Sequence, residues 1–328
     1  MRVIVCSKVG GLESMSIQEQ ARPKPKIGQV LVKVVAIGVN RADILQRRGK
    51  YPPPPDHSDI LGLEIAGEVV EIGSNGTEND EIKIGQRVCG LVNGGAYAEY
   101  CLLDSKMVIK IPAAMKYTEA AGIPEAFLTA YSALFELGDL QAKESVLIHA
   151  GGSGVGTAAI QLAKVAGAKP YVTVGSDGKL VKAVALGAKG GVNHKAHDFA
   201  VTLMQMTKQA GINVIIDCVG ELYSSRNIII LSTGGRLIQI AAMSGVHCHW
   251  DLGDIMRKRL QIKGLTMRSR PLTEKRLLTK QFVQKWLPYF ESKDIVPVID
   301  SVFPFEKVQQ AHSHMESNKN FGKIILEL

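Results

Sequence analysis

The chain of 328 residues contains no apolar run that approaches the roughly 18–20 residues a helix needs to span a bilayer. Met1 to Cys6 lead directly into a strand-like run, without the long apolar stretch of a signal peptide or the Arg- and Ser-rich pattern of a transit peptide. We therefore expect a cytoplasmic protein. The 46% hydrophobic content is typical of a globular chain with a large core, and the length suffices for two domains.

Cysteine is scarce, and no two cysteines are spaced as a Cys-x-x-Cys pair. The five cysteines are Cys6, Cys89, Cys101, Cys218 and Cys248. An odd, widely spaced set argues against a disulfide framework and against a structural zinc site. We expect reduced thiols, most of them packed in apolar runs.

Aromatic residues make up only 5% of the chain, which bears on how its formal net charge of +8 is interpreted. The densest basic cluster, between Arg257 and Arg270, contains no aromatic residue. Interleaved bases and aromatics are the pattern that favours nucleic-acid binding. The sequence therefore does not favour a dedicated nucleic-acid function, and some of the positive charge could attract a phosphorylated cofactor.

The most informative segment runs from Val146 to Ala166. An apolar run over 146–150 predicts a buried strand, a glycine-rich turn over 151–156 follows, and 157–166 predicts a helix that is apolar on most sides. A second apolar run, Pro170 to Val174, completes strand, helix and strand in about 30 residues. This is typical of a dinucleotide-binding unit, in which glycines let the backbone approach a pyrophosphate at the helix N-terminus. The predicted cofactor contacts here are Gly151, Ser153, Gly154, Val155 and Gly156.

The pattern of predicted strands and helices changes twice along the chain. Residues 1 to about 123 carry closely spaced β-like runs broken by Gly and Pro, which predict a partly open barrel or sandwich. From about 124 to 267, strands alternate with helices, which predicts a doubly wound parallel sheet in an α/β protein. The tail from 268 to 328 is too short to bury its own core, so we expect it to pack on the N-terminal domain. The predicted strands of the middle region are 146–150, 170–174, 214–218, 236–240 and 260–266.

Several motifs give the chain a family resemblance over essentially its whole length. They are Asn40 to Asp43, Gln46 to Pro54, Ile60 to Glu64, Ile123 to Ala126, Leu147 to Gln161 and Asn318 to Leu328. In these motifs the chain resembles the zinc-free medium-chain dehydrogenase/reductases of the quinone oxidoreductase group, nearest to the p53-induced quinone oxidoreductase branch. The resemblance implies a GroES-like β-barrel catalytic domain over 1–123 and 268–328, and a Rossmann domain over 124–267.

The resemblance also implies an activity: NADPH in the cleft between the two domains would pass a hydride to a quinone. It further implies a homodimer joined at the edge of the Rossmann sheet near Leu260–Thr266, where an unpaired strand is a template for pairing. Zinc-dependent relatives carry metal ligands at positions that match Asn40 and Leu63-Glu64 here. Leucine cannot bind zinc and an amide is a poor ligand, so no metal is expected.

The end of the second predicted strand distinguishes the two nicotinamide cofactors. An acidic residue there bonds the ribose of NAD, and it would repel a 2′-phosphate. Gly175 and Ser176 stand at this position, and Lys179 supplies a positive charge, which favours NADPH. Asp177 lies one or two residues further on and could point inward. The family branch has Tyr where this chain has His194. The His194 side chain could bond the 2′-phosphate of NADPH, especially when it is protonated.

The remaining candidates come from predicted loops and helix ends. Tyr51, in a proline-stiffened loop, is the first catalytic candidate and could bond the nicotinamide or donate to the quinone. Asn40 and Asp43 open a predicted helix and are the other two catalytic candidates, with direct contacts in the cleft, although one of them could simply cap the helix. Further predicted cofactor contacts are Thr129, Met243, Asn320, Phe321 and Lys323, the last three from the resemblance.

Two alternatives stay open. An enoyl or enone reductase would use the same fold and cofactor with a proton donor such as Tyr51, and a cofactor-regulated RNA-binding protein of the same family would turn over little. The sequence leaves open the physiological acceptor, one- or two-electron reduction, and dimer or tetramer.

Overall fold

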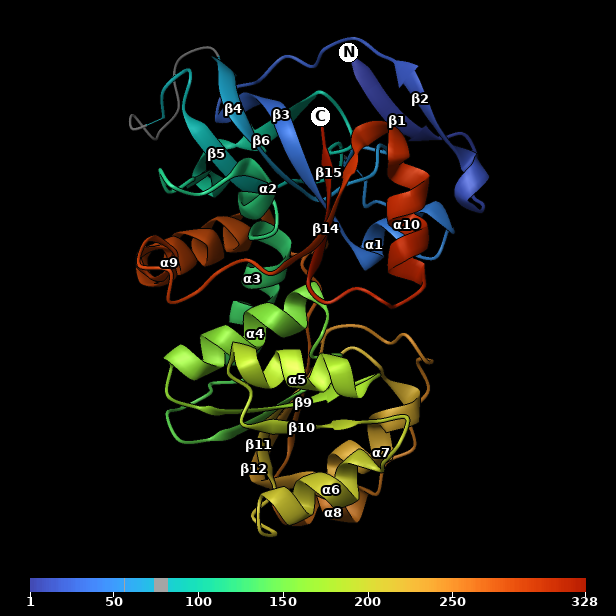
Figure 1. Ribbon diagram of the computed structural model, residues 1–328, viewed down its shortest axis with the longest axis vertical. Helices are drawn as coiled ribbons and strands as arrows, with labels where there is room; N and C mark the ends of the chain where they lie inside the picture. Colours follow the sequence, from blue (N-terminus) through green and yellow to red (C-terminus); the bar gives the residue numbers. More distant parts are fainter. Residues whose placement is uncertain (56, 74–81) are drawn as a thin grey trace. The chain divides into compact units, whose positions relative to one another are not determined.

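The computed structural model describes residues 1–55, 57–73 and 82–328. The chain folds into two compact units: unit 1 comprises Met1–Leu128 and Arg268–Leu328, and unit 2 comprises Thr129–Met267 (Figure 1). The chain passes from unit 1 to unit 2 within helix α3 (Pro124–Tyr131). The sequence-based boundary after residue 123 lies just before this helix.

The described part of unit 2 contains a six-stranded sheet in the order β10-β9-β8-β11-β12-β13, with every neighbouring pair parallel. The strands are β8 (Ser145–Ile148), β9 (Lys169–Val174), β10 (Gly190–Asn193), β11 (Ile212–Asp217), β12 (Leu231–Gln239) and β13 (Gln261–Gly264). The order reverses at β8, because the chain builds β9 and β10 on one side of it and the later strands on the other. The predicted doubly wound α/β fold is confirmed, and ligands of such sheets bind at the carboxyl ends of the strands beside this switch point.

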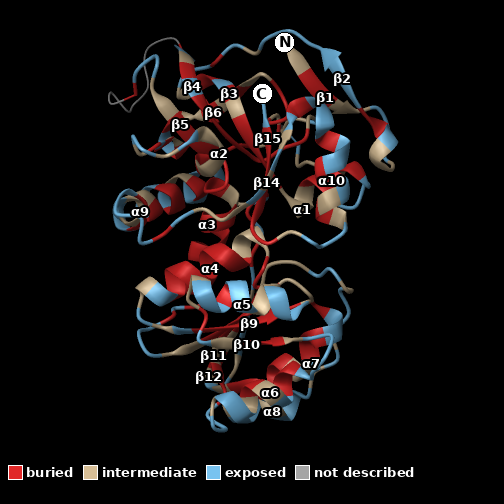
Figure 2. Cartoon of the chain, in the orientation of Figure 1, coloured by how far each residue is buried: buried red, intermediate tan, exposed pale blue. Residues whose placement is uncertain are grey.

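Five helices in the described part of unit 2 follow strands of this sheet. They are α4 (Gly154–Val165), α5 (Asp177–Leu186), α6 (Phe199–Met206), α7 (Glu221–Ile230) and α8 (Leu252–Lys258). Helix α4 is buried at every position from Gly156 to Ala163, whereas α5 shows an exposed face (Figure 2). The small side chains of α4 allow it to lie close to the sheet.

Two features of unit 2 differ from the sequence-based expectation. Strand β10 was not predicted, because Gly190-Gly191-Val192-Asn193 has no apolar run, although it pairs with β9 in register. Strand β12 begins at Leu231, five residues before the predicted start at 236, because its first half is polar and glycine-rich. In β10, sheet pairing overrides a weak local preference. In β12, Leu231 pairs with Ile212, and the register then shifts so that Arg236 lies opposite Val214.

Unit 1 is built on a second sheet, which follows the order β14-β15-β3-β4-β5-β7 with β6 paired to β3 in the described residues. The strands are β3 (Gln29–Val39), β4 (Glu64–Ile72), β5 (Arg87–Leu91), β6 (Tyr100–Asp104), β7 (Ile109–Lys110), β14 (Ile299–Pro304) and β15 (Lys323–Glu327). A separate hairpin pairs β1 (Arg2–Cys6) with β2 (Met15–Glu19). The helices are α1 (Arg41–Arg47), α2 (Tyr117–Ala120), α9 (Leu272–Glu291) and α10 (Val308–Glu316).

The C-terminal strand completes this sheet. β15 pairs antiparallel with β3, so that Ile324 lies opposite Val39, and β14 pairs parallel with β15 (Figure 1). The pairing brings Lys323 to the end of β3, where helix α1 begins. Beneath the sheet, Phe127 packs against Phe290 with ring centroids 4.9 Å apart, and only 2% of Phe127 is exposed. Phe127 is therefore a core residue.

Candidate active site

The glycine-rich turn of unit 2 joins β8 to α4, where the strand order reverses. Ser153 is the N-cap of α4, and its Oγ accepts a hydrogen bond from the Gly156 backbone N–H at 2.9 Å. A Cβ at Gly151 would lie 2.6 Å from Val172, and one at Gly156 would lie 2.5 Å from the Ala150 carbonyl oxygen. Only glycine fits at either position, because the turn packs closely against β9 and on itself.

A polar group gathers at the ends of β9 and β10. A Cβ built on Gly175 would lie 3.6 Å from both His194 Nε2 and Lys195 Cε, so both side chains flank this glycine. Burial, with the Lys195 charge, lowers the pKa of His194, so its ring is neutral at neutral pH. Nearby, the Ser176 side chain accepts a hydrogen bond from the backbone N–H of Lys179 and caps α5.

The carboxylate of Asp177 is tied to this group. Its Oδ1 accepts a hydrogen bond from Asn193 Nδ2 at 3.0 Å. Because Asn193 belongs to β10, the strand that was not predicted, this bond could not be foreseen. The bond ties the first residue of α5 to the last residue of β10.

A buried hydrogen-bond network that was not predicted holds His149, at the start of the glycine-rich turn. His149, 2% exposed, lies 2.9 Å through Nδ1 from Thr173 Oγ1 and 2.8 Å through Nε2 from Asn227 Oδ1. Asn227 donates its amide hydrogen to Asp217 Oδ2 at 3.0 Å, so its Oδ1 must accept from a His149 Nε2–H. Burial lowers the pKa of His149 and keeps the ring neutral.

Asp217 carries this network into the loop after β11. Its Oδ1 accepts hydrogen bonds from the backbone N–H groups of Val219 and Gly220, at 2.5 and 3.2 Å. The neighbouring loop is tied to the same segment, because the backbone N–H of Ser244 donates to Val219 O at 2.8 Å. Met243, in this second loop, is 53% exposed, which leaves it open to a ligand.

Unit 1 contains a buried polar centre at the junction of β3, β4, α1 and β15. Lys323 Nζ donates to Glu64 Oε1 at 2.6 Å, to Asn40 Oδ1 at 2.7 Å and to Val39 O at 3.0 Å. All three ammonium hydrogens are therefore used, and only 5% of Lys323 is exposed. The structure assigns Lys323 to this internal site, which differs from the cofactor contact expected from the sequence. Asn40 completes the centre by donating Nδ2 to Glu64 Oε1 at 2.8 Å.

Asp43 belongs to the same centre but is not open to a substrate, since only 1% of it is exposed. Its carboxylate accepts from the Asn40 backbone N–H at 2.8 Å, which caps α1, and from the Tyr97 hydroxyl at 3.2 Å. Burial raises its pKa to about 6, against the opposing effects of these hydrogen bonds and of Lys323. The geometry makes Asp43 a supporting residue, and the predicted direct catalytic contact is not compatible with its burial.

The network continues away from Asp43 to a buried histidine. Tyr97 has one hydroxyl hydrogen, which Asp43 accepts, so the 2.9 Å contact with His312 is a donation from His312 Nε2–H. Burial and the nearby Arg47 charge lower the pKa of His312 to about 3. Arg47 in turn is paired with Glu316 of α10. His312 is thus a structural, neutral histidine.

The residues at the positions of the relatives' zinc ligands do not fit a metal. Asn40 offers an amide, and the Lys323 ammonium lies 2.6 Å from the Glu64 carboxylate, where a divalent ion would be repelled. Among the residues that the structure describes, no group of three or more His, Cys, Asp or Glu side chains is placed to hold a metal ion.

Tyr51, which is half-buried, lies in a second cluster of unit 1. The Arg268 guanidinium carbon is 5.4 Å from the Tyr51 ring centroid, and Arg268 Nη1 donates to the Tyr51 carbonyl oxygen at 3.4 Å. Lys275 Nζ donates to Arg268 O at 2.9 Å and to Asn93 Oδ1 at 2.8 Å. Burial raises the pKa of the Tyr51 phenol, and the charge of Glu125 raises it further. The phenol therefore keeps its proton and can donate it in a hydrogen bond.

Arg268, Lys275 and Glu125 were not identified from the sequence as site residues. Arg268 and Lys275 are separated from Tyr51 by more than 200 residues, and no local pattern links them. Glu125 follows Pro124 at the start of α3, between apolar residues, and an acid there is an ordinary helix-start preference.

The other predicted contacts lie at separate places. Thr129, 7% exposed, has a buried hydroxyl without a hydrogen-bond partner in the described parts of the chain. Asn320 Nδ2 donates to Gly322 O at 2.9 Å, and the backbone N–H of Phe321 donates to Asp300 Oδ1 at 2.7 Å. The Phe321 side chain is 8% exposed, so it packs in unit 1.

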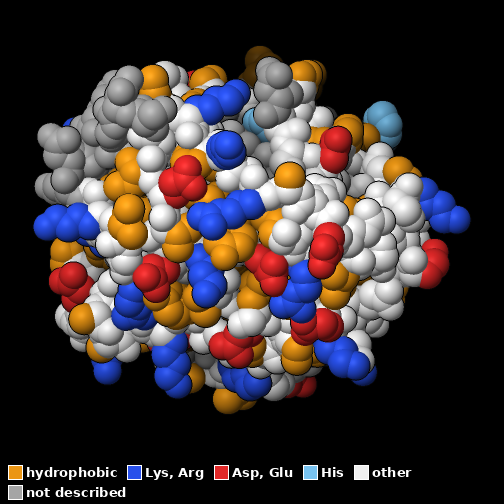
Figure 3. Space-filling model, turned by 90° about the horizontal axis from the view of Figure 1, so that it is seen from above, with side chains coloured by type: hydrophobic (Ala, Val, Ile, Leu, Met, Phe, Trp, Pro, Cys, Tyr) orange, Lys and Arg blue, Asp and Glu red, His pale blue; other side chains and the backbone are white. Residues whose placement is uncertain are grey.

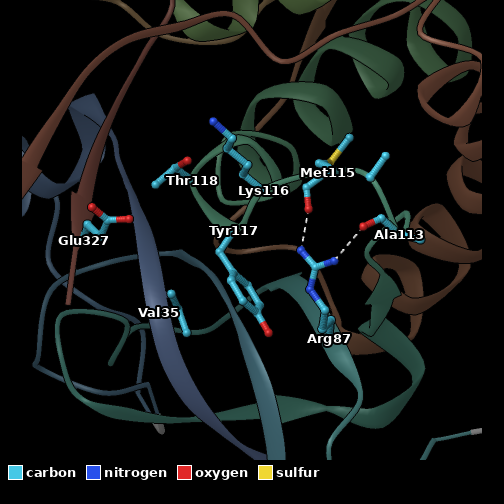
Figure 4. Close-up of a pocket in the computed structure, with 9 residues that line it drawn as sticks. Val35, Arg87, Ala113, Met115, Lys116, Tyr117, Thr118 and Glu327 are labelled. Atoms are coloured by element: carbon cyan, nitrogen blue, oxygen red, sulfur yellow. Dashed lines mark hydrogen bonds between the residues drawn. The ribbon is translucent and has the colours of Figure 1, made fainter.

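A surface pocket of about 440 Å³ in unit 1 is distinct from these groups (Figure 4). Its lining includes Arg87, Tyr117 and Glu327. The guanidinium of Arg87 donates to the carbonyl oxygens of Ala113 and Met115, and it also lies over the Tyr117 ring. The Arg87 charge therefore holds the loop after β7.

Residues 26–113 match the alcohol dehydrogenase GroES-like domain, and residues 154–282 match the zinc-binding dehydrogenase family. The quinone oxidoreductase of Lama guanicoe is 34% identical over 100% of this chain and 98% of its own. The chain therefore belongs to the medium-chain dehydrogenase/reductase family and is an oxidoreductase of that family. No helix in the described segments combines the length and apolarity that crossing a membrane requires.

Solved structures show the same relationship. The Escherichia coli quinone oxidoreductase complexed with NADPH has a TM-score of 0.89 and 28% identity, over 100% of this chain and 99% of that one. The JamJ enoyl reductase has a TM-score of 0.88 and 26% identity, over 99% and 98%. The predicted GroES-like and Rossmann architecture is confirmed by these matches.

Proposed function

We propose that the chain is an NADPH-dependent quinone oxidoreductase that transfers a hydride without a metal. Unit 2 binds NADPH, and unit 1 holds the quinone beside Tyr51. The observation that carries the proposal is the turn capped by Ser153, because it places the N-terminus of α4 at the switch point of a parallel sheet, where a phosphate would bind. Similarity to quinone oxidoreductases, including one complexed with NADPH, supports the acceptor and the cofactor.

The preference for NADPH rests on the polar group around Gly175. Ser176, Lys179, His194 and Lys195 supply donors and positive charge there, and Asn193 holds the Asp177 carboxylate. A 2′-phosphate beside His194 would favour the protonated ring and raise its pKa from the lowered value of the free protein. NADPH should therefore bind more tightly as the pH falls, whereas NADH should respond little.

In this reaction the main task of the protein is to position the nicotinamide and the acceptor. The nicotinamide supplies the hydride when NADPH is bound. Tyr51 and Arg268 place hydrogen-bond donors where negative charge develops on the acceptor oxygen. The supporting centre of Asn40, Asp43, Glu64 and Lys323 fixes the start of α1 in the same unit.

A second candidate function is an enoyl reductase, favoured by the similarity to the JamJ enoyl reductase. It would use the same units but deliver a proton to carbon. An RNA-binding role is less supported, because the densest basic cluster of the sequence, between Arg257 and Arg270, contains no aromatic residue. The face in Figure 3 shows Lys and Arg side chains together with Asp and Glu.

We also propose a homodimer formed through β13. This strand ends the described sheet of unit 2, and Ile262 on it is 36% exposed. Adding a second copy's strand would satisfy its free backbone groups. An Ile262→Pro variant should elute as a monomer in size-exclusion chromatography with light scattering; unchanged mass would contradict this interface.

The experiment that tests the function compares NADPH with NADH as donors and a quinone with an enone as acceptors. Rapid NADPH oxidation with the quinone supports the proposal, and turnover confined to the enone supports the enoyl reductase. NADPH binding without turnover would shift support to a binding role. Lys179→Ala is the test of specificity, because it should weaken NADPH far more than NADH.

A further inference from the structure

Glu125 has an unusual position for an acid. It lies in the first turn of α3, and its backbone N–H donates to Glu64 Oε2 at 2.8 Å, which brings two acidic residues together. The Glu125 side chain is half-buried. Its carboxyl makes no hydrogen bond or ion pair with any residue in the described ranges, in contrast to Glu64 and Asp43. It is therefore the acid of this region that remains available to a ligand.

The charges around Glu125 favour a proton on it. Glu64 pairs with the Lys323 ammonium at 2.6 Å. Burial, followed by the charge of Glu64, raises the pKa of Glu125 to about 8, with a smaller contribution from Asp43 in the same direction. Lys323 and Lys275 act in the opposite direction and do not cancel the effect. At about pH 7 the group is mostly a neutral carboxylic acid with a proton to give.

A second observation points to a ligand at this place. Arg268 is 5% exposed, and its Nε and Nη2 atoms are buried with no hydrogen-bond partner in the described part of the chain. These two atoms form one edge of the guanidinium, whose parallel N–H groups match oxygen atoms of a ligand. A buried guanidinium edge without partners is costly unless a ligand completes it. Arg268 lies near the Tyr51 ring, and Glu125 is close enough to affect the pKa of the guanidinium.

We propose that Glu125 is the general acid of the reaction and that the free edge of Arg268 holds the acceptor oxygen it protonates. This inference rests on the proposed function. NADPH is oxidised as its hydride, with two electrons, passes to the quinone, and the Glu125 O–H bond breaks as its proton joins the quinone oxygen. The product is a hydroquinone, and Glu125 regains a proton from water. NADPH, the quinone and one proton give NADP⁺ and the hydroquinone, so atoms and charge balance.

The division of labour gives distinct kinetic signatures. Glu125→Gln keeps the size and polarity of the side chain but has no acidic proton, so it should lower kcat with the quinone by about 100-fold. Arg268→Met should raise KM for the quinone, because it removes a ground-state and transition-state contact. Glu274→Gln, an exposed acid of α9 in the same unit, is the matched control and should retain wild-type turnover.

The pH profile separates an acid from a residue that only supports the fold. Wild-type kcat should fall as the pH rises through about 8, because Glu125 loses its proton. Glu125→Gln should lack this limb and stay low throughout, and Glu125→Asp should restore part of the activity. Infrared difference spectra provide a readout without turnover: the carbonyl band of a protonated acid should disappear in Glu125→Gln, and also when the wild type is titrated through about pH 8.

Two outcomes would overturn the inference: one leaves the proposed function intact, and the other removes it as well. If the wild type turns over and Glu125→Gln stays within about twofold with the alkaline limb intact, Glu125 is not the acid, although the proposed function stands. If the wild type oxidises no NADPH with quinones or enones, the proposed function fails, and with it any acid role. NADPH affinity, followed by cofactor fluorescence, should stay unchanged in Glu125→Gln because unit 2 binds the cofactor.

Discussion

The pairing of Lys323 with Glu64 yields a sharp prediction about stability. The two charges are 2.6 Å apart, and 5% and 0% of their side chains are exposed. Removing one partner of such a pair leaves an uncompensated buried charge, which costs about 3–5 kcal/mol. Lys323→Met and Glu64→Gln should each destabilise unit 1 by an amount in this range.

The double variant distinguishes pairing from simple loss of contacts. With both charges replaced by neutral groups of similar size, no buried charge is left, and replacing a whole pair is often neutral. Glu64→Gln/Lys323→Met should therefore cost about 2 kcal/mol, far below the sum of the single variants. Part of that cost is the lost contact of Lys323 with Asn40 and Val39.

The chain offers a local probe for this cycle. It has two tryptophans, and Trp286 lies in unit 1, where 1% of it is exposed. In a Trp250→Phe background, denaturant titration followed by Trp286 fluorescence reports the unfolding of unit 1. Additive costs in the double variant would refute the reasoning, because they would mean that the two residues contribute independently.

Three further predictions follow from the titratable groups. His312 is neutral in the folded chain, where its pKa is lowered to about 3, but it takes up a proton in the unfolded chain below about pH 6.5. The free energy of unfolding should therefore fall by about 1.4 kcal/mol for each pH unit below that value. His312→Gln should reduce this loss in acid-denaturation curves. NADPH affinity of the wild type, measured by fluorescence titration, should rise from about pH 8 to pH 6, and His194→Asn should remove the dependence; a slope that survives would exclude His194 from the phosphate site. Tyr51→Phe should slow quinone turnover about tenfold or more, and rates within about twofold of wild type would mean that its hydroxyl has no chemical role.

Local sequence patterns were enough to predict those features that depend on residues close together in the chain. The glycine turn and the cap at Ser153 lie within a few positions of one another, and close packing forces glycine at Gly151 and Gly156. The C-terminal strand was also predictable, because a short apolar run closes the chain. Its partner was predicted only as the N-terminal domain, and the pairing with β3 comes from the structure.

Contacts between distant parts of the chain could not be predicted in this way. Glu64 and Lys323 are 259 positions apart, and nothing in either neighbourhood specifies the other. Glu125 resembled an ordinary helix-start acid, since its raised pKa comes from burial and from a strand far away in sequence. The same reason explains Lys323: a lysine before a terminal strand is usually exposed, and only the packing of β15 on β3 buries it.

The measurement that tests the central claim most directly is the near-ultraviolet absorbance of NADPH after purified protein is mixed with NADPH and a quinone. The account predicts loss of NADPH that depends on both protein and quinone, is much slower with NADH, and is unchanged by metal chelators. NADPH that stays reduced in the presence of protein and every quinone offered, or oxidation that requires an added metal ion, would contradict it.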